Sequence, residues 1–291
     1  MDEHPSGGMT AREDTHGLPA VGKVSAVEAA AHSPEAARDN WDAVTLWGVT
    51  INSLTLPDVL QAVDDRIARG EPGYICTPNV DHVVLYQTHA AFRDSYGGAF
   101  LILPDGVPLI WASHLLRKPL RRKISGSDLI YSLSEHAARQ GHSVFFLGAA
   151  EGVAEEAAGV LAARYPGLKV AGWYSPPEGF ENDAEENGKV IDLLREAAPD
   201  ICYVALGTPK QCLWNWQHHK HAGVPVLIGV GGSFDFVTGK QKRAPRLMQW
   251  MGLEWLWRLC REPRRLWRRY LVRDMRFVPL VWREFRKNKS G

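Results

Sequence analysis

The stretch Ala99-Phe-Leu-Ile-Leu-Pro-Asp-Gly-Val-Pro108 is an unbroken apolar run that stops at Pro104-Asp105-Gly106. A short continuous apolar run favours a strand buried on both faces, and Pro-Asp-Gly is typical of a turn at its carboxyl end. In open parallel sheets, ligands bind in the crevice beyond the carboxyl ends of the strands. We therefore expect Asp105 either to meet a ligand at this edge of the sheet or only to shape the turn and cap the next helix.

Strand and helix patterns alternate along most of the chain, most regularly between residues 143 and 230. Such alternation indicates βαβ units, so we predict an α/β fold: a Rossmann-like, mostly parallel sheet with helices on both faces. Nearer the N-terminus the pattern predicts one strand over residues 44–51, a helix over 56–68, a short strand from residue 74 and a helix over 83–92.

Composition divides the chain into three parts. Residues 1–40 carry few large apolar side chains and no sustained periodicity, so we expect an extension that does not fold. Residues 41–240 form the predicted α/β core, and residues 241–291 a basic, Trp-rich helical appendage. The whole chain is 45% hydrophobic, which is ample for a large core.

The net charge of +1 hides a strong asymmetry. Residues 240–291 hold 16 Lys and Arg against four acids, a balance of +12, whereas the rest of the chain has a balance of −11. A basic segment of this kind indicates a contact surface for phosphates, nucleic acid or anionic lipid.

Large apolar side chains recur in the basic segment at three- and four-residue steps: Trp267, Tyr270, Leu271, Val278, Val281, Trp282 and Phe285. This spacing predicts an amphipathic helix that Pro263 and Pro279 bend or split. Its apolar face either lies in a bilayer interface or packs on the protein's own core.

The four cysteines are far apart and form no CxxC pair, which indicates neither a metal site nor a disulfide framework and fits a reducing cytoplasm. No apolar run approaches the roughly 20 residues that a membrane-spanning helix needs. We therefore expect a protein that is neither exported nor membrane-spanning, and that has no metal site.

Other polar side chains also follow predicted strands. Thr77 and Asn79 lie between a strand and a helix start, where free N–H groups favour anions, although Asn79 could simply be the helix N-cap. Gln211 lies in the first turn of a predicted helix, near the same edge or on the surface. Asp235 follows the last strand, where an acid either binds ribose hydroxyls or caps a turn.

Three further positions are weaker candidates. Lys123 ends the basic connector 117–123, which either contacts phosphate or forms a solvated face. Gly148 and Gly207 lie in glycine turns after strands. Neither turn completes GxGxxG, and such turns often only let a strand and a helix pack closely.

Several motifs occur in order between Trp47 and about Phe277: Thr77-Pro-Asn79, Leu103-Pro-Asp-Gly106, Ser125-Gly-Ser-Asp128, Leu206-Gly-Thr-Pro-Lys-Gln211, Gly229-Val-Gly-Gly-Ser-Phe-Asp-Phe236 and Glu262-Pro-Arg-Arg-Leu-Trp-Arg-Arg-Tyr270. In this combination the chain resembles the bacterial TagA/WecG/CpsF/GumM glycosyltransferases, glycosyltransferase family 26. The resemblance implies an inverting, metal-independent enzyme that needs no cofactor and binds no nucleic acid. It would move a sugar from a UDP-sugar to a polyprenyl-diphosphate-linked saccharide in cell-surface or exopolysaccharide biosynthesis, at the cytoplasmic face of the plasma membrane.

The resemblance also implies roles for single residues. Asp105 matches the base, and Asp235 matches a residue that holds the uridine ribose. The remaining matches line the sugar and diphosphate pocket or close over it from the appendage: Thr77, Asn79, Gln211, Arg258, Arg265 and Arg268. Relatives often carry arginine where this chain has Lys123, which weakens a diphosphate role there because lysine lacks the bidentate fork.

Two alternatives come from other classes. A dehydrogenase would explain the alternating pattern and Gly229-Val-Gly-Gly232, but a dinucleotide fingerprint should follow the first strand of a βαβ unit. A non-catalytic binding module would grip lipid through the basic segment, with the α/β body as scaffold. The donor sugar (N-acetylmannosamine, its uronic acid or glucose) and the oligomeric state, including a homo-oligomer, stay open.

Overall fold

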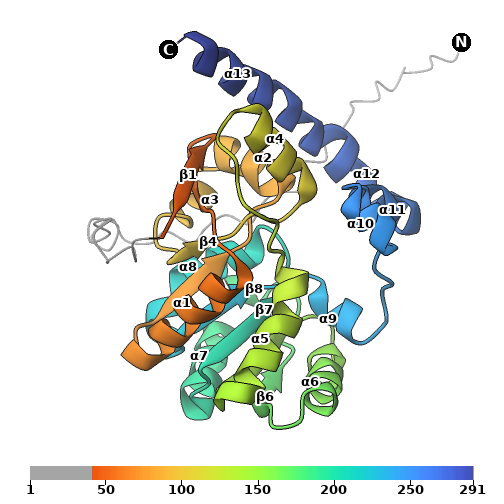
Figure 1. Ribbon diagram of the computed structural model, residues 1–291. Helices are drawn as coiled ribbons and strands as arrows, with labels where there is room; N and C mark the ends of the chain where they lie inside the picture. Colours follow the sequence, from red (N-terminus) through yellow and green to blue (C-terminus); the bar gives the residue numbers. More distant parts are fainter. Residues whose placement is uncertain (1–40, 291) are drawn as a thin grey trace, which may run out of the picture. The chain divides into compact units, whose positions relative to one another are not determined.

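The computed structural model describes residues 41–290, so the predicted unfolded extension over residues 1–40 lies outside the described residues. A six-stranded sheet, parallel at every pairing, forms the centre of the described part (Figure 1). Its strands in spatial order are β4 (Leu101–Ile102), β3 (Gly73–Cys76), β8 (Val226–Gly229), β7 (Ile201–Ala205), β5 (Ser143–Gly148) and β6 (Lys169–Tyr174). This arrangement confirms the predicted fold class.

Helices cover both faces of the sheet, because successive side chains of a strand point to opposite faces. In β5, Val144 and Phe146 belong to one core and Phe145 and Leu147 to the other. The first core is completed by α1 (Leu56–Arg69), α5 (Gly126–Gln140), α6 (Val153–Arg164) and α9 (Ser233–Val237). The second is completed by α2 (Val80–Thr88), α3 (Ala90–Asp94), α4 (Val107–Leu115), α7 (Ala184–Ala197) and α8 (Lys210–Ala222), with the 3-10 turn η2 (Phe180–Asn182).

Local sequence signals begin and end these helices. Thr55 and Asp58 form a capping box at the start of α1, and Gly70 ends the helix in the left-handed conformation. Ser125 caps α5 by accepting a hydrogen bond from the Asp128 N–H, and Gly141 ends that helix in the same way as Gly70.

The strand expected over residues 44–51 is wrong in detail, because the segment folds back on itself. The hairpin strands β1 (Ala43–Leu46) and β2 (Val49–Asn52) pair antiparallel in a separate sheet. Between them Trp47 and Gly48 have φ of 52° and 82°, which is typical of a tight two-residue hairpin turn. Asn52 Oδ1 accepts a hydrogen bond from Ile102 N at 2.8 Å, so the hairpin covers the free edge of β4. The helix expected over residues 83–92 likewise divides into α2 and α3.

The basic segment is a chain of short helices followed by a longer one: α10 (Arg246–Trp250), α11 (Glu254–Arg261), α12 (Pro263–Trp267), the π-helical η3 (Arg268–Arg273), the 3-10 turn η4 (Asp274–Arg276) and α13 (Phe277–Ser290). Pro263 opens α12, so the predicted split occurs there. Pro279 lies in the first turn of α13, where its missing N–H leaves no hydrogen bond unmade.

The expected apolar stripe divides into two faces. Phe277 is buried with its ring 5.0 Å from that of Trp47, and Val281 and Phe285 pack against the same core. Tyr270 is partly buried, with its ring 6.0 Å from that of Trp255. The other members of the stripe are exposed: Trp267, Leu271, Val278 and Trp282. Four large apolar side chains outside the stripe are exposed as well: Leu247 and Trp250 of α10, and Trp111 and Leu115 of α4. Packing on the core is therefore confirmed for one part of the stripe, and contact of the exposed part with a bilayer stays a prediction. Within residues 41–290, no helix has both the length and the apolar character needed to cross a membrane.

Candidate active site

A cavity of about 900 Å³ lies at the carboxyl ends of β3, β4, β7 and β8, with α11, α12 and η3 as its other wall. The topology explains the place, because the chain leaves β3 toward one face of the sheet, into α2, and leaves the adjacent β8 toward the other face, into α9. The cavity brings together ten of the predicted site residues: Thr77, Asn79, Asp105, Lys123, Gly207, Gln211, Asp235, Arg258, Arg265 and Arg268.

Asp105 is half-buried at this edge. Its backbone is fixed because Asp105 N donates to Pro78 O at 2.7 Å and Ile124 N donates to Pro104 O at 2.8 Å. Burial raises the pKa of Asp105 to about 7, and the nearby Lys123 charge opposes this rise. A carboxylate whose pKa lies near neutrality is well matched to accept a proton from a hydroxyl group.

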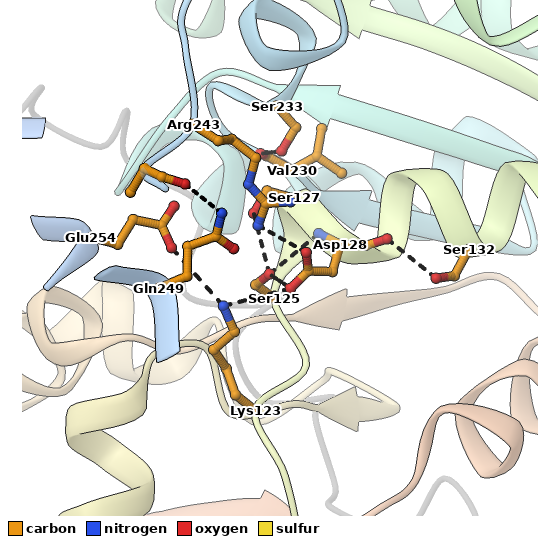
Figure 2. A network of polar contacts seen from close by, with 11 residues as sticks. Lys123, Ser125, Ser127, Asp128, Ser132, Val230, Ser233, Arg243, Gln249 and Glu254 are labelled. Atoms are coloured by element: carbon orange, nitrogen blue, oxygen red, sulfur yellow. Dashed lines mark hydrogen bonds and ion pairs between the residues drawn. The ribbon is translucent and has the colours of Figure 1, made fainter. Parts of the chain in front are cut away.

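Lys123 faces carboxylates rather than forming a solvated face (Figure 2). Its Nζ lies 3.5 Å from Asp128 Oδ2 and 4.0 Å from Glu254 Oε2. Asp128 also pairs with Arg243, 2.8 Å away, whose Nη2 donates to Ser127 Oγ at 3.2 Å. This network ties the start of α5 to the basic segment, and it partly neutralises the Lys123 charge.

Gln211 braces the floor of the cavity. It is buried, so the surface alternative is wrong, and its Oε1 accepts a hydrogen bond from Gly231 N at 2.9 Å. A Cβ on Gly229 would lie 2.7 Å from Gln211 Nε2, so β8 must end in glycine for this amide to fit. Thr77 is also buried, with its hydroxyl 3.5 Å from Gly229 O.

Asn79 is the predicted helix N-cap, and its predicted contact with a ligand stays a prediction. It is the N-cap of α2, because its Oδ1 accepts a hydrogen bond from His82 N at 3.2 Å, and it also lines the cavity. His82 is buried beneath it, 2.7 Å from the Tyr96 hydroxyl and 2.6 Å from the Thr208 hydroxyl. Burial lowers the pKa of His82 to about 3, so this imidazole is neutral.

Asp235 lies in the first turn of α9 and lines the cavity, while Gly232 occupies the N-cap position. Burial raises the pKa of Asp235, and the Arg265 charge opposes that rise. Arg265 Nε lies 2.6 Å from Glu262 Oε2. The Arg258 guanidinium lies over the Phe236 ring, 5.8 Å from its centroid. The basic segment therefore delivers positive charge to the wall opposite Thr77 and Asp105.

Gly148 is the one predicted site residue that does not line the cavity. It has φ of 100°, and a Cβ there would lie 2.8 Å from Ala205 O. The close approach of the turn after β5 to the end of β7 therefore accounts for this glycine, and the expected substrate contact is not reproduced.

The sequence interpretation missed four charged residues at the junction of α2 and the basic segment: Asp81, Arg269, Arg273 and Asp274. The four-residue spacing of the two arginines, which puts them on one helical face, was the only local signal. Their partner Asp81 lies almost 200 residues earlier, so no short-range pattern connects them. Among the described residues, no group of three or more His, Cys, Asp or Glu side chains is arranged to hold a metal ion.

Comparison with known proteins agrees with this architecture. The profile of the glycosyl transferase WecG/TagA/CpsF family matches residues 44–291. The chain belongs to this family. Among curated relatives, a protein of Bacillus spizizenii is 38% identical over 68% of this chain and 74% of its own length. One of Staphylococcus aureus is 30% identical over 79% of this chain and 89% of its own length.

Both relatives are named N-acetylglucosaminyldiphosphoundecaprenol N-acetyl-β-D-mannosaminyltransferase. Membership of the WecG/TagA/CpsF family confirms the resemblance inferred from the motifs and makes this chain a glycosyltransferase. It also decides against both the dehydrogenase and the non-catalytic binding module.

Proposed function

We propose that this chain transfers N-acetylmannosamine from its UDP-activated form to a polyprenyl-diphosphate-linked N-acetylglucosamine, with inversion at the anomeric carbon. The names of the two relatives support the sugar and the acceptor. The observation that carries the proposal is the meeting of Asp105 with Arg258, Arg265 and Arg268 around one cavity.

In the proposed reaction, Asp105 accepts the proton of the acceptor hydroxyl as its oxygen attacks the anomeric carbon. The attack comes from the face opposite the UDP group. The bond between the anomeric carbon and the phosphate oxygen breaks, and its electron pair leaves with UDP. The pKa of about 7 supports the role of Asp105, because the group is largely ionised slightly above neutral pH yet basic enough to take a proton.

Negative charge develops on the departing diphosphate and must be met by cations. We assign this role to Arg258, Arg265 and Arg268, whose guanidinium groups do not depend on a bound metal. Lys123 is held between Asp128 and Glu254, so its main proposed effect is on the ionisation of Asp105.

The remaining polar groups are assigned to the donor. Thr77, Asn79 and Gln211 lie at the floor of the cavity and would contact the sugar and the diphosphate, with Gly207 beside them. Asp235 would hold the ribose hydroxyls, for which a carboxylate at a strand end is suited.

We also propose that the enzyme acts while bound peripherally to the inner face of the plasma membrane. Exposed Trp250, Trp267 and Trp282 belong to the same segment that carries the excess of arginine. Aromatic and basic side chains together favour the interface of an anionic bilayer, at about 1 kcal/mol per basic residue near the surface.

A screen of UDP-sugars tests the proposal. Purified protein, anionic vesicles and a short-chain polyprenyl-diphosphate-linked N-acetylglucosamine are combined with UDP-N-acetylmannosamine, its uronic acid or UDP-glucose, with and without EDTA. Release of UDP and the mass of the lipid product are measured. We expect turnover with UDP-N-acetylmannosamine that EDTA leaves unchanged. Preference for another donor would overturn the sugar assignment, and loss of turnover with EDTA would overturn the role given to the arginines.

A further inference from the structure

A buried carboxylate joins the α/β core to the basic segment. Asp81 lies in the first turn of α2, and its side chain is 1% exposed. Arg269 Nε of η3 lies 3.1 Å from Asp81 Oδ2, and Arg273 Nε lies 2.5 Å from Asp81 Oδ1. Arg273 Nη2 also donates to Asp81 Oδ2 at 2.9 Å, so this guanidinium holds both carboxylate oxygens. One aspartate thus binds two arginines that lie almost 200 residues later in the chain.

The other titratable groups at this junction do not take over the role of Asp81. Burial and the nearby Asp81 charge raise the pKa of Asp274 to about 7, so this carboxyl is partly protonated at neutral pH. His82 is neutral, and its two ring nitrogens face the Tyr96 and Thr208 hydroxyls. Among the described residues, Asp81 is the only carboxylate within ion-pair distance of Arg269 or Arg273.

The arginines that Asp81 binds line the same cavity as Arg265 and Arg268, and Asp81 also lies at its edge. Helix α12 continues directly into η3, so Arg265 and Arg268 belong to the same run of helix as Arg269 and Arg273. Arg265 and Arg268 line the cavity that Asp105 also lines. Because α12 and η3 form one unbroken helical run, a contact that holds Arg269 and Arg273 on the core also limits where Arg265 and Arg268 can lie.

We propose that Asp81 is a positioning residue: by binding Arg269 and Arg273 it holds α12 and η3 on the core and so keeps Arg265 and Arg268 in the cavity. It acts through these arginines, since both of its oxygens are occupied by guanidinium groups. The inference rests on the proposed function, because it needs the cavity arginines to act on the departing diphosphate.

The isosteric variant Asp81→Asn removes the charge and leaves two guanidinium groups uncompensated at a buried site. These groups regain water when the segment lifts from the core. Lifting the segment costs less free energy than unfolding the sheet. We expect tryptic cleavage between residues 261 and 276 to become at least ~10-fold faster in the full-length protein. Arg273→Gln should have the same effect from the other side of the pair, which covers the case in which Asp81→Asn does not fold.

Glu156→Gln is the matched control. Glu156 pairs with Lys240 at 2.9 Å and so also links the core to the start of the basic segment, but both side chains are nearly half exposed. An exposed pair contributes little, so this variant should keep the wild-type cleavage rate and activity.

Kinetics separate positioning from simple destabilisation. We expect Asp81→Asn to lower kcat by about the same factor as Arg268→Gln, on the order of 10-fold to 100-fold, with a smaller change in KM for the donor. The double variant of Asp81→Asn and Arg268→Gln should lose little more activity than the worse single variant, because both substitutions remove the same interaction.

Two outcomes would show instead that Asp81 acts directly on substrate: additive losses of activity in the double variant, or lost activity with an unchanged cleavage rate. Unchanged activity and cleavage would overturn the inference outright. The cleavage assay needs no sugar transfer, so it tests the contact even if the proposed function fails.

Discussion

At the scale of single residues, the chemistry of the proposed reaction depends on how the protein sets the ionisation of Asp105. The carboxylate is partly withdrawn from water at the end of β4, while Lys123 and Arg258 lower its pKa and Glu254 and Asp128 raise it. Burial outweighs the cations, and the result is a base with a pKa of about 7 rather than an ordinary surface aspartate.

Asp105→Asn should keep the fold and lose the reaction. The amide is isosteric but cannot accept the proton of the acceptor, so we expect kcat to fall by about 10²-fold to 10⁴-fold. Transfer assays and UDP binding by calorimetry check this, and binding should remain. Asp192→Asn, at an exposed position of α7, is the control and should retain full activity. Wild-type turnover in Asp105→Asn would assign the base elsewhere.

The raised pKa of Asp105 also predicts opposite effects of pH on activity and stability. Activity should rise between pH 6 and pH 8 with an ionisation near 7, as the base loses its proton. The pKa of Asp105 in the folded state exceeds its unfolded value of 3.8, so at pH values between about 4 and 7 the folded state binds more protons than the unfolded state. The stability that this group contributes therefore falls as the pH rises through that range. We therefore expect the free energy of unfolding of Asp105→Asn, measured by chemical denaturation, to increase relative to that of the wild type as the pH rises from about 4 to 7. An activity profile that is flat between pH 6 and pH 8 would contradict the assignment.

At the scale of elements, the site is divided between the strand ends of the sheet and the short helices α11, α12 and η3. The strand ends carry the base and the polar floor, and the helices carry the cations. Arg258 lies on α11, whereas Arg265 and Arg268 lie on the continuous run of α12 and η3, so the break at Glu262 between α11 and α12 lets the segment curve around one cavity.

Replacing the cavity arginines one at a time tests their role. We expect Arg258→Gln, Arg265→Gln and Arg268→Gln each to lower kcat by roughly 10-fold to 100-fold, because the charge on the departing diphosphate is then less stabilised. Arg261→Gln is the matched control, since Arg261 lies on α11 but does not line the cavity. Steady-state kinetics with the preferred UDP-sugar make the comparison. Equal activity of all four variants would remove the arginines from the mechanism.

At the scale of the whole molecule, the described part of the chain carries its positive charge and its exposed aromatic groups in the same C-terminal segment. Trp111 and Leu115 of α4 add apolar surface from the core, and a Cβ at Gly252 would lie 3.2 Å from the Trp111 ring, so this helix touches the basic segment. The proposed membrane surface is therefore built from both parts of the protein.

Vesicle binding tests this surface. Replacing Trp250 and Trp282 together by Ala should lower binding to vesicles with anionic lipid at least ~10-fold, because two interfacial aromatic groups are lost. High salt should weaken binding of the wild-type protein by screening the arginines. Trp173→Ala is the control, since Trp173 is similarly exposed but lies on β6, at the edge of the sheet away from β4. Equal binding of all three proteins in flotation assays would place the membrane contact on other residues.

The sequence by itself determined the class of fold, the strand end that carries Asp105 and the charge of the basic segment. These features depend on periodicity, turn residues and composition within about 15 neighbouring positions, which a linear pattern records. Only the tertiary structure decided that residues 44–51 form a hairpin, that the apolar stripe divides into a packed and an exposed face, and that Asp81 meets Arg269 and Arg273. Contacts of this kind join segments far apart in the chain, and they depend on how the faces of the sheet and the helices pack, which no local pattern contains.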